Sequence, residues 1–440
     1  MNAFRSAVPK LVHLSALLAT AALAALAFQK SVLAQGYDYP FVNAYEATVI
    51  GTPSIYRAEL PKQVPKQELR LTVFPKRRIP ELFWYHDQLH YAVVRQRQKA
   101  PLIFNIAGTG ASHNSQLMQA MEKIFYKAGF HVISLPSPTH PNFIVTASET
   151  QAPGLLADDA RDLYRVMQGA YEQIAHTIEV SEFYLTGYSL GAAQAAFVAK
   201  LDEEVGAFDF KKVLMINPPV SLYNSVEILD GMIDAIPGGP DNFNAFFESL
   251  FQRFAAIYRD EDFLDLTDDF LYFAYKKDPP SEESLRAVVG IAFRISAANI
   301  LFASDALTRS GVVIRRNVSL STLDSLTRYL KVSVRVGFVD YIRYLLHPFF
   351  EKRRPGVRLE ELIEESSLQA IEGYLRGTEK IGLMTNEDDI ILAPGELDYL
   401  RSVFGSRARI YVKGGHCGNL EHKDNVADMI RFFGAGWPAP

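Results

Sequence analysis

Short runs of consecutive apolar residues alternate along the chain with longer segments in which apolar residues recur every three or four positions. The short runs are typical of strands buried on both faces, and the longer segments are typical of amphipathic helices. Between residues 100 and 220 the alternation predicts strands at 102–107, 131–135, 183–186 and 212–217. Repeated strand–helix units of this kind build a parallel sheet with helices on both faces.

The alternation stops after Pro219. Residues 220–378 show mostly helical periodicity, including a stripe of Phe, Tyr, Leu and Ile side chains at 243–258 that falls on one helical face. The alternation then resumes with two further strands, at 380–385 and 409–412. We therefore predict that 220–378 form a helical cap or lid inserted into the fold, outside the sheet.

The core is predicted to consist of residues 35–219 and 379–440. Its first part contains one strand at Tyr45–Ile50 and two antiparallel strands ahead of the main sheet, at 68–74 and 90–97.

Residues 1–34 have the features of an export signal. Arg5 and Lys10 precede an almost unbroken apolar run from Leu11 to Phe28, and small residues lead up to a cleavage site after Ala34. We expect a periplasmic or secreted protein, cleaved near Ala34. The apolar run is also just long enough to span a bilayer. The alternative is a retained anchor, with membrane association through residues 11–28.

Composition narrows the function classes. A formal net charge of −5 is unlike that of a nucleic-acid-binding protein. Cys417 is the single cysteine, so no disulfide can form within the chain, which together with the export signal favours a bacterial origin. Neither a metal-binding motif nor a phosphate-binding loop is present. We expect no cofactor and no metal ion.

The candidate chemistry centres on Gly187-Tyr188-Ser189-Leu190-Gly191, which joins the strand at 183–186 to a helix rich in alanine. So sharp a turn needs small residues two positions either side of the serine, because these approach each other closely. The turn lifts the Ser189 hydroxyl clear of the sheet. The motif resembles the nucleophile elbow of the α/β-hydrolase superfamily, and the resemblance covers roughly residues 100–217 and 379–435. It implies an α/β-hydrolase fold, with a mostly parallel central sheet, and Ser189 as the nucleophile.

A serine nucleophile needs a histidine that takes its proton and an acid that orients the histidine. In the family these follow the serine in the order acid, histidine, in loops after the last two strands. Here an acidic cluster, Glu387-Asp388-Asp389, follows the strand at 380–385, and His416 follows the strand at 409–412. Family loops place the acid just before an apolar pair, which selects Asp389, with Asp388 as the alternative.

The resemblance also implies an oxyanion hole of two backbone amides. One belongs to Leu190, the residue after the nucleophile. The other is expected in the loop after the first core strand, at Thr109. The family often has His-Gly before this position, whereas this chain has Ala107-Gly108.

These features predict an exported serine hydrolase, esterase- or lipase-like, that cleaves a small, apolar carboxylic ester through an acyl-enzyme. An amidase, a thioesterase or an acyltransferase would use the same three residues. A non-catalytic binding protein on a hydrolase scaffold is the competing class. The substrate itself would be set by 220–378, which carries no motif that identifies it.

Overall fold

The computed structural model describes residues 36–246, 248–249, 252 and 270–437. The predicted targeting segment at 1–34 lies outside the described residues, as does most of the apolar stripe at 243–258.

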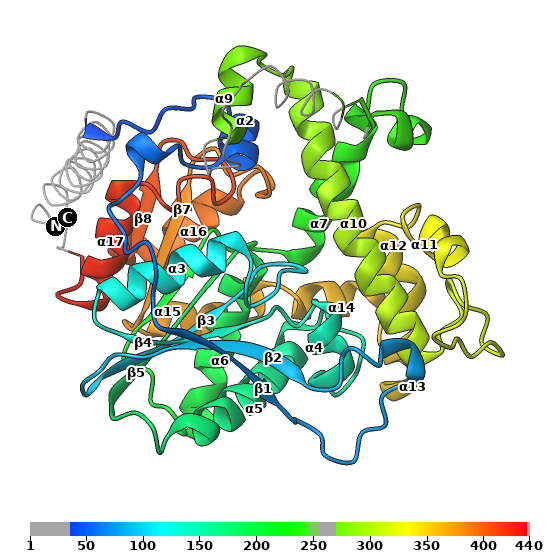
Figure 1. The fold of residues 1–440 in the computed structure, drawn as a ribbon, viewed down its shortest axis with the longest axis horizontal. Coiled ribbons are helices and arrows are strands. Elements are labelled where there is room, and N and C mark those ends of the chain that lie inside the picture. Colours follow the sequence, from blue (N-terminus) through cyan, green and yellow to red (C-terminus); the bar gives the residue numbers. More distant parts are fainter. Residues whose placement is uncertain (1–35, 247, 250–251, 253–269, 438–440) are drawn as a thin grey trace, which may run out of the picture.

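A mixed sheet of eight strands, in the order β1-β2-β4-β3-β5-β6-β7-β8, forms the centre of the described structure (Figure 1). β2 is antiparallel to both β1 and β4, and every other pair is parallel. This is the strand order of the α/β-hydrolase fold, which confirms the predicted fold class. The strands are Lys66–Leu71, Leu89–Val94, Ala100–Ile106, His131–Leu135, Val180–Tyr188, Val213–Ile216, Ile381–Asn386 and Ala408–Tyr411.

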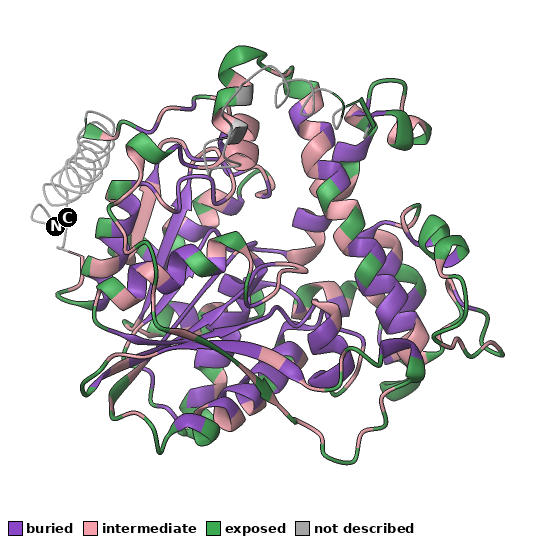
Figure 2. Cartoon of the chain, in the orientation of Figure 1, coloured by how far each residue is buried: buried purple, intermediate pink, exposed green. Residues whose placement is uncertain are grey.

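Helices cover both faces of the sheet because successive strand residues point to opposite sides. α3 (Gln116–Lys127) and α17 (Lys423–Phe433) pack on one face, where Ile103 is buried. α5 (Leu156–Ile174), α6 (Leu190–Val205) and α16 (Glu396–Phe404) pack on the other, where the next residue, Phe104, is buried. Figure 2 shows the central strands buried between these two layers.

The described part of 220–378 is helical and adds no strand to the sheet. Its longest element, α10 (Glu282–Thr308), is long and apolar enough to span a bilayer, but 56% of its apolar window is buried inside the molecule, as in the core helix of a globular protein. The others are α7 (Leu222–Gly231), η3 (Met232–Ala235), η4 (Pro240–Asn242), α9 (Phe270–Lys277), α11 (Thr327–Ser333), α12 (Phe338–Tyr341), η5 (Ile342–Leu346), α13 (His347–Arg353), α14 (Leu359–Glu365), η6 (Leu368–Ile371) and α15 (Glu372–Gly377).

The strand predicted at Tyr45–Ile50 is wrong, because residues Ala44–Ile50 form a helix, α2. The Asn43 side chain accepts hydrogen bonds from the amides of Tyr45 and Glu46, at 2.8 and 3.2 Å, and so caps its first turn. This N-cap outweighs the strand preference of the β-branched residues that follow. The helix is relevant to function, since it packs against the loop that carries His416.

Candidate active site

Ser189 lies in the sharp turn between β5 and α6, with φ of 55° and ψ of −129°. Few residues other than glycine adopt a positive φ, so this backbone is strained. The turn can close only because Gly187 has no side chain: a Cβ there would lie 2.3 Å from the carbonyl oxygen of Gly191. A Cβ on Gly191 would in turn lie 2.4 Å from the carbonyl oxygen of Ile106. The close approach predicted for the two glycines is confirmed.

Gly191→Ala is therefore expected to destabilise the protein by about 1–3 kcal/mol, because its methyl group would press on the backbone of Ile106 and Ala107. Urea denaturation of both proteins measures the difference. Gly373→Ala is the matched control, since a Cβ at this helical glycine meets no atom within 4 Å. Its effect should be neutral or slightly stabilising. Equal losses in the two variants would contradict the assignment of a packing role to Gly191.

The structure brings Ser189, His416 and Asp389 together from three loops at the carboxyl ends of parallel strands. His416 Nε2 lies 2.9 Å from the Ser189 hydroxyl oxygen. On the other side of the ring, Nδ1 lies 3.0 and 3.2 Å from the two carboxylate oxygens of Asp389. A continuous chain of hydrogen bonds thus runs from a buried carboxylate to the serine hydroxyl.

Asp389 is held by groups that the sequence analysis did not identify. Asn217, at the end of β6, donates from its side-chain nitrogen to Asp389 Oδ2 at 2.7 Å, and the amide of Ile391 donates to Oδ1 at 3.2 Å. Asn217 has a positive φ of 49°, which directs the chain out of the sheet. The sequence feature that could have pointed to Asn217 as part of the site is its position between an apolar strand and Pro218-Pro219.

The alternative acid, Asp388, points elsewhere. Its carboxylate accepts hydrogen bonds from the amides of Gly414 at 3.1 Å and Gly415 at 2.9 Å. Burial raises the pKa of this carboxyl, and the two amides oppose that shift. Asp388 therefore holds the loop that carries His416, while Asp389 contacts the imidazole itself.

The His416 loop also rests against α2. The His416 amide donates to the Thr48 hydroxyl oxygen at 2.9 Å, and that hydroxyl donates to the carbonyl of Ala44 at 2.7 Å. Gly415 has φ of +57°, and a Cβ there would lie 2.3 Å from the Ala44 carbonyl oxygen. The helix that was predicted as a strand thus fixes the position of the histidine.

The electrostatics of His416 reflect opposing effects. Burial alone would lower the pKa of the imidazole, but the neighbouring Cys417 and the Asp389 carboxylate together raise it well above the usual value. The carboxylate favours the charged ring because it accepts a hydrogen bond from Nδ1–H and its negative charge stabilises the positive one. An imidazole placed this way can take a proton from Ser189 at Nε2 and keep the resulting charge beside Asp389.

Thr109 and Leu190 flank the nucleophile. Leu190 is the first residue of α6, so its amide has no acceptor within the helix. The loop with Thr109 passes close by, because a Cβ on Gly108 would lie 3.1 Å from Ser189 Cβ. This loop is fixed at its next residue, where the amide of Gly110 donates to the Thr139 hydroxyl at 2.8 Å.

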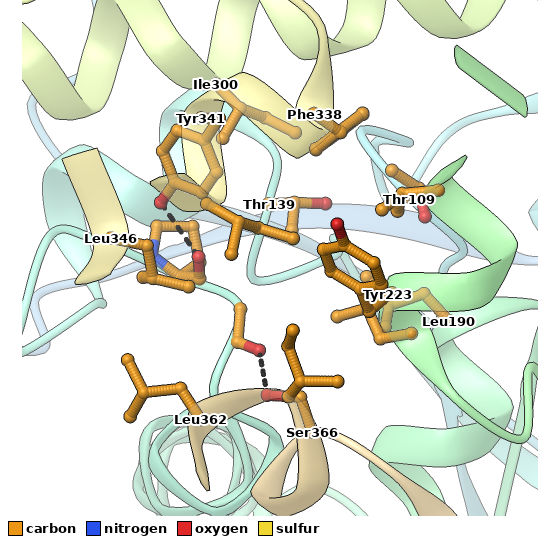
Figure 3. Close-up of a pocket in the computed structure, with 16 residues that line it drawn as sticks. Thr109, Thr139, Leu190, Tyr223, Ile300, Phe338, Tyr341, Leu346, Leu362 and Ser366 are labelled. Atoms are coloured by element: carbon orange, nitrogen blue, oxygen red, sulfur yellow. Dashed lines mark hydrogen bonds between the residues drawn. The ribbon is translucent and has the colours of Figure 1, made fainter. Parts of the chain in front are cut away.

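Two cavities meet at Thr109. One, of about 430 Å³, contains Ser189 and His416 and is walled by α10 side chains, among them Val288, Ala292, Phe293 and Ser296. The other is a narrow apolar cavity of about 30 Å³ that starts at Thr109 and Leu190. Figure 3 shows Tyr223, Ile300, Phe338, Tyr341 and Leu346 of the insertion around it. The inserted helices therefore supply much of the wall around the serine.

One group among the described residues has the spacing of a metal site, formed by Asp38, His422 and Asp424. Its polar atoms are already used, because Lys423 lies 2.6 Å from Asp38 and His422 Nε2 lies 3.1 Å from the same carboxylate. None of the three residues lines the cavity that contains Ser189.

No protein-family model and no curated protein matches this sequence. Solved structures resemble its fold at low sequence identity. One comes from a study of two esterases of the fungus Rhizomucor miehei, with 12% identity, a TM-score of 0.42 and coverage of 86% of this chain and 85% of the other. An esterase from the archaeon Pyrobaculum calidifontis has 14% identity, a TM-score of 0.39 and coverage of 93% and 97%. The thioesterase domain of the curacin biosynthetic pathway has 12% identity, a TM-score of 0.36 and coverage of 83% and 98%. Because these TM-scores are below 0.5, the α/β-hydrolase fold rests on the strand order, and no subfamily is assigned.

Proposed function

We propose that this protein is a serine hydrolase that cleaves a carboxylic ester through an acyl-enzyme intermediate. The observation that carries the proposal is the unbroken chain of hydrogen bonds from Asp389 through His416 to Ser189. Ser189 lies on the strained turn after β5, where a nucleophile is exposed to a substrate cavity.

In the first step the Ser189 oxygen attacks the ester carbonyl carbon while His416 Nε2 takes the hydroxyl proton. Asp389 accepts the Nδ1 proton of the ring in a hydrogen bond and stabilises the imidazolium. The tetrahedral intermediate collapses, the carbon–oxygen bond to the alcohol breaks, and His416 returns the proton to the leaving alcohol. Water then repeats the sequence on the acyl-enzyme and releases the acid.

The negative oxygen of each tetrahedral intermediate needs donors that are already in place. We assign this role to the backbone amides of Thr109 and Leu190. The hydrogen bond from Gly110 to Thr139 keeps the first loop rigid, and the start of α6 fixes the second amide. Both donors then act without the cost of reorganising during the reaction.

The cavity favours an uncharged, apolar substrate. Its described lining residues include no Lys, Arg, Asp or Glu, and most are aliphatic or aromatic. A charged substrate group would lose its hydration there without gaining a partner. This supports a neutral ester over a peptide with free termini. An amidase, a thioesterase or an acyltransferase would use the same residues. We also propose that the protein is exported, and this proposal rests only on the sequence of residues 1–34.

A panel of p-nitrophenyl esters from acetyl to palmitoyl, each run against Ser189→Ala as blank, tests this function. We expect hydrolysis by the wild type, with kcat/KM rising about fourfold for each methylene group until the cavity is filled, because each buried methylene contributes about 0.8 kcal/mol. The matched anilides and an ester with a charged acyl chain should be poor substrates. A ligand that both proteins bind equally and leave unmodified would instead indicate a binding protein.

A further inference from the structure

A surface rich in arginine lies at the C-terminal end of α10, away from the cavity that contains Ser189. The helix contacts the serine cavity with residues near Ala292, and its last residue, Thr308, is followed by a surface loop. This loop lies beside the segment after β1. We call the resulting surface the arginine face and define it by Arg309, Arg315, Arg316 and Leu323 from the loop and by Trp84 and Tyr85 from the earlier segment.

The two segments of the arginine face form one structure. They line a common cavity of about 150 Å³, whose apolar part includes Phe83 and Ile314 and whose charged lining residues are Asp305, Arg309, Arg315 and Arg316. A hydrogen bond of 3.1 Å from the Thr322 hydroxyl to Glu81 ties the segments together. Three arginines thus line one cavity together with apolar side chains.

Asp305, a buried residue near the end of α10, fixes the backbone of the loop. This buried carboxylate accepts hydrogen bonds from four successive backbone amides at 2.6, 3.1, 2.7 and 2.7 Å, those of Gly311, Val312, Val313 and Ile314. These bonds therefore fix the conformation of the loop that carries the arginines. The same bonds occupy the oxygen atoms of Asp305, and its single negative charge leaves the three arginines in excess.

The charge of this region is opposite to that of the whole protein. Residues 305–335 contain six basic residues and two acidic ones, whereas the full chain has 45 basic and 50 acidic residues. Among the described residues, Arg309, Arg315 and Arg316 have no carboxylate within ion-pair distance. The arginine face is a local cationic surface on an acidic protein.

Large apolar side chains of the same two segments are exposed. Leu323 is 95% exposed and Trp84 is 69% exposed, with Tyr85 beside it at 52%. Single exposed apolar residues are common on protein surfaces, but these three belong to two segments that the bond from Thr322 to Glu81 holds together. Tryptophan and tyrosine favour the level of the lipid headgroups, and arginine is attracted to anionic lipids.

We propose that the arginine face docks this protein on an anionic phospholipid bilayer. The arginines would contact lipid phosphates, and Trp84, Tyr85 and Leu323 would enter the interfacial layer. A protein partner is less favoured by these observations, because Trp84, Tyr85 and Leu323 are few and come from two segments that also carry exposed arginines. This surface is separate from the apolar segment at 11–28, and it would hold the folded body against the membrane.

The chain contains two tryptophans, Trp84 and Trp437, so the full-length Trp437→Phe protein reports on Trp84 alone. With vesicles of phosphatidylcholine and phosphatidylglycerol we expect its emission to shift to shorter wavelength and to be quenched by brominated acyl chains. Pure phosphatidylcholine and inorganic phosphate should produce neither change. In this background Arg309→Gln with Arg315→Gln should raise the lipid concentration for half of the shift about 25-fold, since each cation contributes about fivefold.

The matched control removes the same charge elsewhere, with Lys62→Gln and Lys99→Gln at exposed positions, and should leave the shift unchanged. Circular dichroism shows whether the variants are folded. The proposal is overturned if the protein sediments with anionic vesicles while Trp84 stays accessible to water, since 11–28 would then account for binding. It is also overturned if both double variants weaken the shift equally, or if an acidic protein shifts Trp84 and vesicles do not.

Discussion

Ser189→Ala is expected to lower kcat/KM for the best ester substrate by about 10⁴-fold or more, to the level set by binding and the oxyanion hole. The alanine keeps the Cβ and the strained backbone of the turn, so the fold and both cavities should persist. What is lost is the oxygen that lies 2.9 Å from His416 Nε2. A fluorophosphonate probe, which bonds covalently to activated serines, should label the wild type and not this variant.

The control for this experiment is Ser181→Ala, which removes an exposed hydroxyl from the same strand, β5. It should be labelled and should hydrolyse esters at the wild-type rate. Equal labelling of wild type and Ser189→Ala would show that the probe reacts elsewhere and would reject Ser189 as the nucleophile. Unchanged thermal denaturation of the variants would exclude unfolding as the cause of lost activity.

The sheet could be predicted from the sequence because a strand buried on both faces has a recognisable local pattern of apolar residues. The strand Val213–Ile216, for example, is a continuous apolar run that stops where the backbone leaves the sheet. The order of strands could not be derived from such runs alone. It followed from the resemblance that the glycines around Ser189 suggested. The periodicity of Phe338–Leu346 predicts a helix that ends at His347-Pro348, but the helical path continues through a π turn, Ile342–Leu346, into α13.

The site was predictable where it depended on chain order and not where it depended on contacts between distant segments. Ser189 and His416 each follow a strand end, so their loops had to meet at one edge of the sheet. Asn217 and Thr48 left no comparable pattern. Asn217 reaches Asp389 only because its backbone turns to a positive φ, and Thr48 lies 368 residues from His416 in the chain. Tertiary packing, which short sequence windows do not record, sets both contacts.

Asp388 and Asp389 are adjacent acids whose tertiary contacts could not be told apart from the local sequence. Both are buried or partly buried acids in one loop, and composition and spacing treat them almost alike. The fold separates them, because one side chain points to the amides of Gly414 and Gly415 and the other to the ring of His416. The two acids should therefore differ in how their removal changes the reaction.

Asp389→Asn is expected to lower kcat/KM about 10⁴-fold, because an amide that donates to Nδ1 holds the imidazole in the wrong tautomer. Asp388→Asn should cost less than about tenfold, since its side-chain oxygen can still accept one of the two amide hydrogen bonds. Steady-state kinetics on the best ester compare the two, and denaturation controls for folding. A larger loss in Asp388→Asn would make Asp388 the acid of the triad.

The pH profile separates a role in charge stabilisation from a role in holding the loop. Asp389 favours the imidazolium and helps to raise the pKa of His416, so the wild type should lose activity as the pH falls through that raised pKa. Removing this carboxylate lowers the pKa of the ring, and the acid limb of kcat/KM in Asp389→Asn should move to lower pH even as the plateau falls. Asp388→Asn should keep the acid limb near its wild-type position, because its carboxylate contacts backbone amides and not the ring. An acid limb that moves in Asp388→Asn and stays in Asp389→Asn would reverse the assignment, since of the two carboxylates only the one that contacts the ring should favour its charged form.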